Sequence, residues 1–272
     1  MADPFPMSVH FAAPTLPTRA SILLARRLVL PLLVLLVWET ASHLELVSPK
    51  LLPPLETLVK RGGEEFAQGR LPRDIAASLT RDLLGFALGA MLGTSLGILL
   101  GLSSLLRHLI KPTFDALKQI AIFAWIPLVS VWFGIGEAAK IAFIAIAAFT
   151  PCLVNTLTGM AGIPRPYIEV AKVLDFSPWS FLTRLAIPAA LPSIFTGLHL
   201  GLIHSWLATI GAEYFMTAGP GIGGMMIAGR EQFEMDLVLL GVILLASIGV
   251  LLNNAALHVE TYVLSWRKTS AQ

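Results

Sequence analysis

The sequence predicts an all-α membrane protein with about six transmembrane helices. Of its 272 residues, 56% are hydrophobic and only 13% are charged, against roughly 25% charged in an ordinary soluble domain. The charges are also bunched, so that long intervals carry none. A helix needs roughly 18 to 20 residues to cross a bilayer. Five uncharged intervals reach that length: residues 83–106, 119–136, 141–164, 185–212 and 237–259.

A weaker sixth span is expected near the N-terminus, over residues 28–47. Glu39 and Glu45 interrupt it, but two arginines precede it and it has the length to cross. The polar leader before it contains no short apolar region with a small-residue cleavage site, so we interpret this span as an uncleaved anchor. The expected organisation is a cytoplasmic leader over residues 1–27, one transmembrane domain over 28–268 and a tail over 269–272.

The distribution of Lys and Arg predicts the orientation of these spans. Six spans put both termini on one side, and cytoplasmic loops carry the excess of basic residues. The N-terminal segment, the 107–118 turn, the 161–184 loop and the tail hold 11 Lys and Arg against five Asp and Glu. The remaining loops hold more acidic than basic residues. We therefore expect the first set of loops, and both termini, to be cytoplasmic.

A glycine-rich loop near the C-terminus is expected on the opposite, outer side. Gly219, Gly221 and Gly224 form a G-x-G-x-x-G pattern, which binds a dinucleotide only between a strand and a helix of one βαβ unit. Here a long apolar stretch lies on either side instead. The pattern therefore predicts a tight re-entrant turn between two spans rather than a nucleotide site.

The second span carries glycines at four-residue intervals: Gly85, Gly89, Gly93, Gly97 and Gly101. Such a row lets the backbone of a neighbouring helix approach closely, which is how helices associate in lipid. The alternative is that these glycines are incidental, because glycine is common in membrane helices. We favour a helix-packing seam because the spacing is so regular.

The longest cytoplasmic loop, residues 163–192, is too polar to cross the membrane. Pro164 and Pro166 suit a helix start, and residues 167–174 are amphipathic. The "FSPW" segment is expected to break this helix before a second short segment that ends at Pro188. The first helix could rest on lipid headgroups. The interpretation that we favour is a docking helix for a soluble partner.

This loop resembles the EAA motif of importer-type ATP-binding-cassette permeases. Glu169 and Ala171 match the opening Glu and the second Ala of the motif, and Pro188 matches its closing Pro. Val170 replaces the first Ala, and Asp175 replaces the motif Gly. The second of these departures concerns the backbone of the loop, because Asp adopts a left-handed conformation less readily than Gly.

The resemblance extends over about residues 45–268. The segments "IPLVSVWFGIGEAAKI", "LPSIFTGLHLG" and "GAEYFMTAGPGIGGMM" are similar to those of sulfonate, taurine and nitrate permeases. The resemblance implies a type I importer permease fold with a cytoplasmic coupling helix, in the bacterial inner membrane. It also implies a homodimer working with two cytoplasmic ATPases and an extracytoplasmic solute-binding protein. ATP and magnesium would then belong to the ATPase chain, and this sequence has no G-x-x-x-x-G-K-[ST] loop of its own.

The resemblance also selects the residues that would couple this chain to the ATPase. Val173, Leu174 and Phe176 would supply apolar contacts, and Glu169 would supply a charge that either pairs with a basic group of the ATPase or holds the loop. The full set of candidates is Glu169, Ala171, Val173, Leu174, Asp175, Phe176 and Pro188.

Candidate residues for the cargo path come from the spans themselves. His199, Trp206 and Glu213 recur every seven residues, which places them along one face of a helix. Polar groups inside a membrane usually face protein or water, so this stripe could line the path. Alternatively, Glu213 is solvated near the outer end and His199 bonds a neighbouring helix.

Two further residues, Trp125 and Asn155 on the third and fourth spans, are also candidates for the path. His204 points away from the stripe, and we interpret it as a packing or interhelical group. The cargo that the resemblance implies is a small anion. An aliphatic sulfonate comes first, with taurine, nitrate, bicarbonate or an aromatic acid as alternatives.

Functions from other classes find less support. A stand-alone secondary transporter would carry its own coupling-ion site and repeated broken helices in two halves, and no such repeat is evident. A membrane hydrolase would need a catalytic or metal-binding set, but "HLGLIH" is not H-E-x-x-H. We expect no catalytic residues, no metal site and no nucleic-acid partner on this chain, with membrane lipid as its surroundings.

Overall fold

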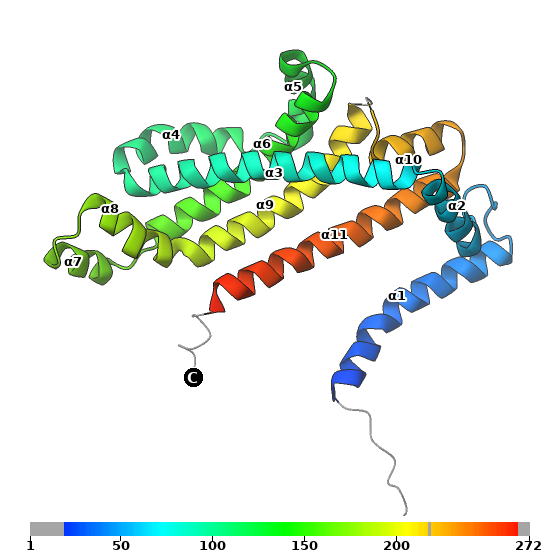
Figure 1. Ribbon diagram of the computed structural model, residues 1–272, viewed down its shortest axis with the longest axis horizontal. Coiled ribbons are helices and arrows are strands. Elements are labelled where there is room, and N and C mark those ends of the chain that lie inside the picture. The colour runs from blue at the N-terminus through cyan, green and yellow to red at the C-terminus, as the bar shows by residue number, and fades with distance from the viewer. Residues whose placement is uncertain (1–18, 217–218, 266–272) are drawn as a thin grey trace, which may run out of the picture. The chain divides into compact units, whose positions relative to one another are not determined.

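The computed structural model describes residues 19–216 and 219–265, with side chains from residue 29 onward. The described chain is helical and contains no strand (Figure 1), which confirms the predicted all-α class. The expected tail, residues 269–272, and most of the expected leader lie outside the described residues. The elements in chain order are α1 (Arg19–His43), α2 (Leu55–Ala67), α3 (Arg70–Leu102), α4 (Ser104–Leu117), the 3₁₀ turn η1 (Ile122–Trp125), α5 (Ile126–Phe133), α6 (Glu137–Ala161), α7 (Arg165–Val173), α8 (Pro178–Phe181), the π-helical turn η2 (Leu182–Ala186), α9 (Ile187–Phe215), α10 (Ile222–Glu231) and α11 (Met235–Val263).

Residues 1–55 and residues 56–272 form two compact units. In the first unit, α1 is followed by a turn that folds back on the end of the helix. Trp38 Nε1 donates to the Pro53 carbonyl at 3.0 Å, and the backbone N–H of Leu55 donates to Glu39 Oε2 at 3.1 Å. Glu39 therefore has a structural role. Its carboxylate accepts from the first N–H of α2, and this N–H has no carbonyl of a preceding helical turn to bond.

Four helices in the described chain are long and apolar enough to cross a membrane: α3, α6, α8 to α9 taken together, and α11. A fifth span exists if α4 and the η1–α5 segment count as one, although they meet at a bend of 96°. The expected third span, residues 119–136, is therefore not one straight helix. Pro127 lies at the start of α5, and Gly134 at φ 76° ends this helix after eight residues.

The first expected span lies within α1, Arg19–His43, which has 25 residues. Its side chains are described only from Val29 to His43. Among the residues whose side chains are described, four or five segments are long and apolar enough to cross, against about six expected from the sequence. The fold class itself is unaffected, because the four long helices are those that the uncharged intervals predict.

In the second unit, α6 packs between α3 and α9. All five glycines of the row, Gly85 to Gly101, face α6: a Cβ added at Gly93 would lie 2.5 Å from the Phe149 carbonyl oxygen. On the other side of α6, a Cβ added at Gly201 would lie 2.7 Å from Cys152 Sγ. The two helices can approach α6 this closely only because no side chain stands between the backbones.

The second half of the 163–192 loop differs from the prediction. Helix α8 continues through η2 into α9 without a break at Pro188. Proline cannot donate a backbone hydrogen bond, which normally ends or kinks a helix. Here a π turn absorbs the defect, with the Ile187 N–H bonding the Leu182 carbonyl five residues back.

The glycine-rich loop differs as well. The expected tight turn between two spans is instead a short entry into α10, which lies between α9 and α11 (Figure 1). Gly219 has φ 84°, a left-handed conformation that favours glycine. Ile222, which begins α10, is fully buried.

Candidate functional site

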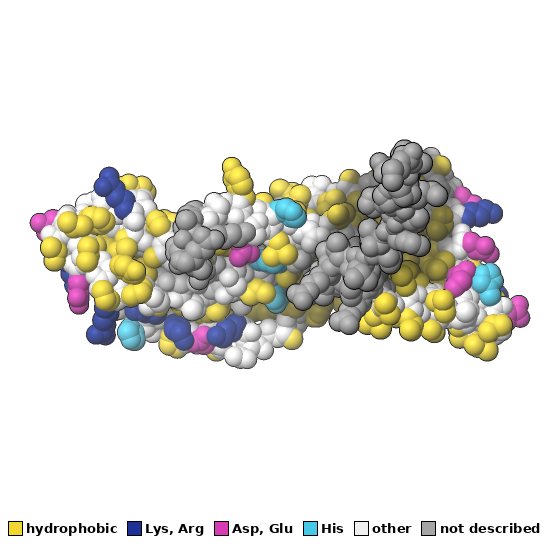
Figure 2. Space-filling model, turned by 90° about the horizontal axis from the view of Figure 1, so that it is seen from below, with side chains coloured by type: hydrophobic (Ala, Val, Ile, Leu, Met, Phe, Trp, Pro, Cys, Tyr) yellow, Lys and Arg dark blue, Asp and Glu magenta, His cyan; other side chains and the backbone are white. Residues whose placement is uncertain are grey.

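Helix α7 lies at one end of the second unit, and α10 lies at the other end (Figure 1). Ala171 faces inward and is buried, whereas Tyr167, Val170 and Val173 are exposed, Val173 to 82%. Figure 2 shows hydrophobic side chains gathered over this end of the molecule, with charged side chains around them. Among the residues that the structure describes, none covers this exposed apolar surface of α7.

The end of α7 has the hydrogen bonds of a Schellman motif. The N–H of Phe176 bonds the Ala171 carbonyl at 3.0 Å, and the N–H of Asp175 bonds the Lys172 carbonyl at 3.1 Å. Asp175 has φ 47°, the left-handed conformation that the motif requires at this position. Asp175 thus occupies a left-handed position at which glycine is the usual residue. Leu174 and Glu169 are exposed beside it, while Phe176 is half-buried.

At the opposite end, an ionic network joins three helices. Arg81 of α3 donates through Nη1 to Glu213 of α9 at 2.6 Å and through Nη2 to Glu137 of α6 at 2.7 Å. The Arg81 and Glu213 side chains are 4% and 2% exposed. Burying such charges is favourable only when they are paired and hydrogen-bonded. Lys140 Nζ adds a fourth charge, 3.9 Å from Glu137.

The same network holds the glycine-rich entry to α10. Glu213 Oε1 accepts from Ser78 Oγ at 2.7 Å, and Glu213 Oε2 accepts from the Gly223 N–H at 2.8 Å. The Ile222 N–H in turn donates to Ser78 Oγ at 3.0 Å. A Cβ added at Gly221 would lie 2.6 Å from the Glu213 carboxylate, so the glycine is needed for close approach. Glu213 is therefore an anchor for this loop rather than a solvated surface group.

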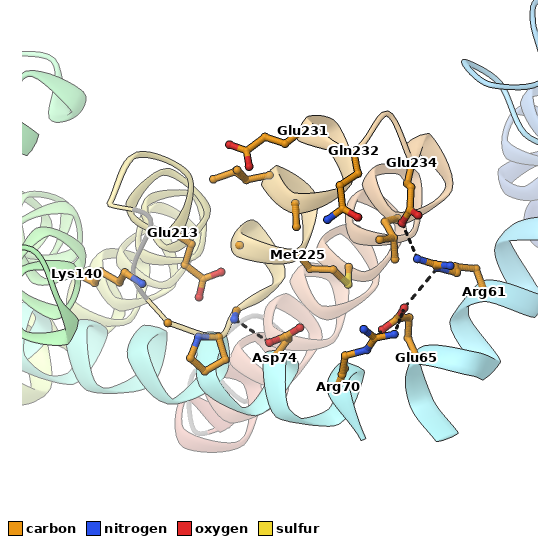
Figure 3. A pocket seen from close by; sticks show the side chains of 17 residues that line it. Arg61, Glu65, Arg70, Asp74, Lys140, Glu213, Met225, Glu231, Gln232 and Glu234 are labelled. Atoms are coloured by element: carbon orange, nitrogen blue, oxygen red, sulfur yellow. Dashed lines mark hydrogen bonds and ion pairs between the residues drawn. The ribbon is translucent and has the colours of Figure 1, made fainter. Parts of the chain in front are cut away.

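A hollow of about 590 Å³ opens beside this network, among α2, the start of α3, α10 and the start of α11 (Figure 3). Its walls carry both signs of charge. Arg61 bonds Glu234 at 2.6 Å, Arg70 pairs with Glu65 at 2.7 Å, and Asp74 accepts from the Gly221 N–H at 3.0 Å. These pairs connect α2 and α3 to the segment around α10.

The remaining members of the predicted stripe lie between helices. Trp206 is 7% exposed, and its Nε1 donates to the Leu245 carbonyl of α11 at 3.1 Å. His199 bonds Asn253 Oδ1 of α11 at 2.8 Å. The stripe therefore faces α11 and α3, and it supports helix packing in the described chain. That His199 bonds a neighbouring helix is the alternative that the sequence left open.

The other two path candidates line a common cavity. Trp125 and Asn155 lie on an open cavity of about 770 Å³ bordered by the end of α4, residues 118–121, η1, α6 and α9. His204, predicted to be a packing or interhelical group, lines the same cavity and is exposed. Thr150 and aromatic rings from three elements complete its walls: Phe114, Phe123 and Phe149.

Sequence reasoning missed the ionic network and the cavity for different reasons. Arg81, Glu137 and Glu213 are each near the end of a span, but nothing in the sequence shows that the three ends meet. The cavity depends on the 96° bend after α4, which separate uncharged intervals do not reveal. Within the described residues, no group of three or more His, Cys, Asp or Glu side chains could hold a metal ion.

The chain is similar to several known proteins. Residues 89–263 match the family described as "Binding-protein-dependent transport system inner membrane component". A Bacillus subtilis (strain 168) protein named as an aliphatic sulfonates transport permease is 34% identical over 242 residues, covering 89% of this chain and 87% of its own length. The taurine transport system permease protein of Escherichia coli (strain K12) is 32% identical over 238 residues, covering 86% of each chain.

Two further similarities extend the comparison. A bicarbonate transport system permease protein of a Synechocystis species is 34% identical over 240 residues, covering 84% of this chain and 85% of its own. Among solved structures, an inward-facing form of the MetNI methionine ABC transporter matches with a TM-score of 0.58 and 19% identity, covering 71% of this chain and 95% of that chain. This last similarity shows the type I importer permease fold.

Proposed function

This chain belongs to the family of binding-protein-dependent transport system inner membrane components, and we propose that it is the permease subunit of an ATP-driven importer of a small anion. Two copies would form the path through the membrane. Two cytoplasmic ATPases would bind ATP and magnesium and supply the energy, and an extracytoplasmic solute-binding protein would deliver the cargo. The chain itself would carry out no chemical step.

The observation that carries this proposal is the exposed apolar surface of α7. Val173 and Leu174 are 82% and 61% exposed, and the Schellman motif at Asp175 fixes the end of the helix. An amphipathic helix of this kind binds by laying its apolar residues into a groove of the partner. The partner would be the ATPase. The end of the second unit that carries α7 would then be cytoplasmic, together with both chain termini.

The cargo that we propose first is an aliphatic sulfonate. Relatives named for aliphatic sulfonates, taurine and bicarbonate are each about one-third identical to this chain. These anions share oxygen atoms that accept hydrogen bonds, so one permease architecture suits all of them. Taurine, bicarbonate, nitrate and aromatic acids are the alternatives, and selection among them would rest in part on the solute-binding protein.

Reconstitution tests the proposal. The chain, its ATPase and its solute-binding protein are placed in liposomes, and uptake of each anion is measured with ATP hydrolysis. Val173→Asp should abolish ATP-driven uptake, because it places a charge in the apolar contact. Val59→Asp, at an equally exposed valine of α2, is the matched control and should retain uptake. Uptake that continues without ATPase and ATP would instead indicate a stand-alone transporter.

A further inference from the structure

The cavity between α6 and α9 lies at the middle of the membrane-crossing helices. Thr150 is near the centre of α6, and His204 is near the centre of α9. An ionisable side chain at such a depth is costly, so it usually serves a function. No Asp or Glu occurs among the described residues that line the cavity, whereas Lys118 and His204 both do. The site is therefore suited to a negatively charged ligand.

Several neutral side chains of this cavity can donate hydrogen bonds. Asn155 Nδ2 gives one hydrogen to the Pro151 carbonyl at 2.9 Å, which leaves its second hydrogen for a ligand. The Thr150 hydroxyl and the Trp125 indole N–H are further donors by chemistry. A few polar groups in a mostly apolar wall are typical of small-molecule sites.

The hydrogen bond of His204 determines which nitrogen can meet the ligand. Its Nδ1 lies 2.7 Å from the Leu200 carbonyl, four residues back on the same helix. A carbonyl only accepts, so Nδ1 carries the proton in this bond. In the neutral ring, Nε2 is then an acceptor and cannot bond an anion. Only the imidazolium offers an Nε2–H together with a positive charge.

We propose that this cavity binds the transported anion and that His204 takes up one proton from solvent to do so. The proposal rests on the proposed function for the class of the ligand. It makes the affinity of the path itself depend on pH: binding is tight when the ring is protonated and weak when it is neutral. The anion and the proton would then enter the cavity together as one charge-balanced pair.

The other charged and titratable groups near the cavity do not supply this behaviour. Lys118 already pairs with Asp115 at 2.7 Å. On α6 the thiol of Cys152 lies against the Gly197 carbonyl, 3.4 Å away and on the side of α9. The remaining ionisable groups of α9 point elsewhere, since His199 contacts α11, Glu213 joins the ionic network and Tyr214 contacts Arg230. No ionisable residue occurs in η1 or α5, both fully described.

A direct binding measurement tests this proposal without the other subunits. The full-length chain in lipid nanodiscs is titrated with radiolabelled ethanesulfonate at pH 6 and pH 8, the range over which histidine changes charge. Wild-type affinity should be about tenfold or more higher at pH 6, because a hydrogen bond to a charged donor is lost at pH 8. His204→Gln should remove the pH dependence. His204→Arg, with a permanent charge, should bind tightly at both values.

His258→Gln is the matched control, because His258 of α11 is exposed and makes the same Nδ1 bond to a carbonyl four residues back, at 2.7 Å, outside the cavity. It should keep the wild-type pH dependence. Persistence of that dependence in His204→Gln, or absence of binding to the wild type at pH 6, would overturn the proposal. Failure of ATP-driven uptake alone would count against the proposed function and leave this binding result standing.

Discussion

Arg81 and Glu213 form an ion pair that is closed off from solvent, with Nη1 2.6 Å from Oε1 and both side chains at most 4% exposed. Removing one partner of a buried pair leaves the other charge uncompensated, which costs about 3 to 5 kcal/mol. Glu213→Gln should therefore lower the melting temperature in detergent markedly. Asp115→Asn, which breaks the half-exposed pairs of Asp115 with Lys111 and Lys118, should leave it nearly unchanged. Equal melting of both variants would show that the network is not structural.

Close approach along the glycine row gives a second prediction. A Cβ at Gly93 would lie 2.5 Å from the Phe149 carbonyl oxygen, so even Gly93→Ala should destabilise the fold, and Gly93→Leu should prevent assembly. Gly63→Ala on α2 is the control, because a Cβ there has nothing within 4 Å. It should be neutral or stabilise by up to about 1 kcal/mol, since Ala favours helix. Thermal melts of the three variants decide between packing and incidental glycines.

The glycine row could be predicted from the sequence, whereas the ionic network could not. Gly85 to Gly101 could be interpreted because their interval repeats along one helix, and a helical period is a local property. The network needs Arg81, Glu137 and Glu213 from three helices, and their meeting depends on tertiary packing. Likewise the helix continues through Pro188 because a π turn absorbs the missing donor, which no local rule for proline predicts.

Two tryptophans separate packing from the cargo path. Trp206 is buried and bonded to the Leu245 carbonyl, so Trp206→Ala should cost about 3 to 5 kcal/mol of stability, as other large core truncations do. Trp125 lines the cavity and is only half-buried. Trp125→Ala should change the anion selectivity of uptake with a small effect on melting. If Trp206→Ala instead folds well and changes the anion selectivity of uptake, Trp206 lines the cargo path.

Topology is tested by labelling single cysteines with an impermeant reagent. Val173→Cys on α7 should react only after the cells are opened, and Ile135→Cys, before α6 and 75% exposed, should react in intact spheroplasts. Cys152→Ala is the background. Reversed labelling would place α7 outside and remove the docking of the ATPase.

The coupling residues give the sharpest prediction, because backbone and side chain can be varied separately. Glu169 is exposed, so Glu169→Ala should leave melting unchanged while cargo-stimulated ATP hydrolysis is lost. That outcome would indicate that the Glu169 carboxylate contacts the ATPase. A lower melting temperature of the variant would indicate instead that the carboxylate holds the loop.

Asp175 tests the backbone. At φ 47° a glycine has no steric cost, an aspartate tolerates the left-handed region, and a β-branched residue does not. Asp175→Gly should therefore keep ATP hydrolysis coupled to uptake. Asp175→Val should shift the end of α7, displace Val173 and Leu174 from the partner, and let hydrolysis proceed without uptake. Val170→Ala introduces the first Ala of the EAA motif that this loop resembles, and it should be coupled. Full coupling in Asp175→Val would mean that the Schellman motif is not needed for transmission.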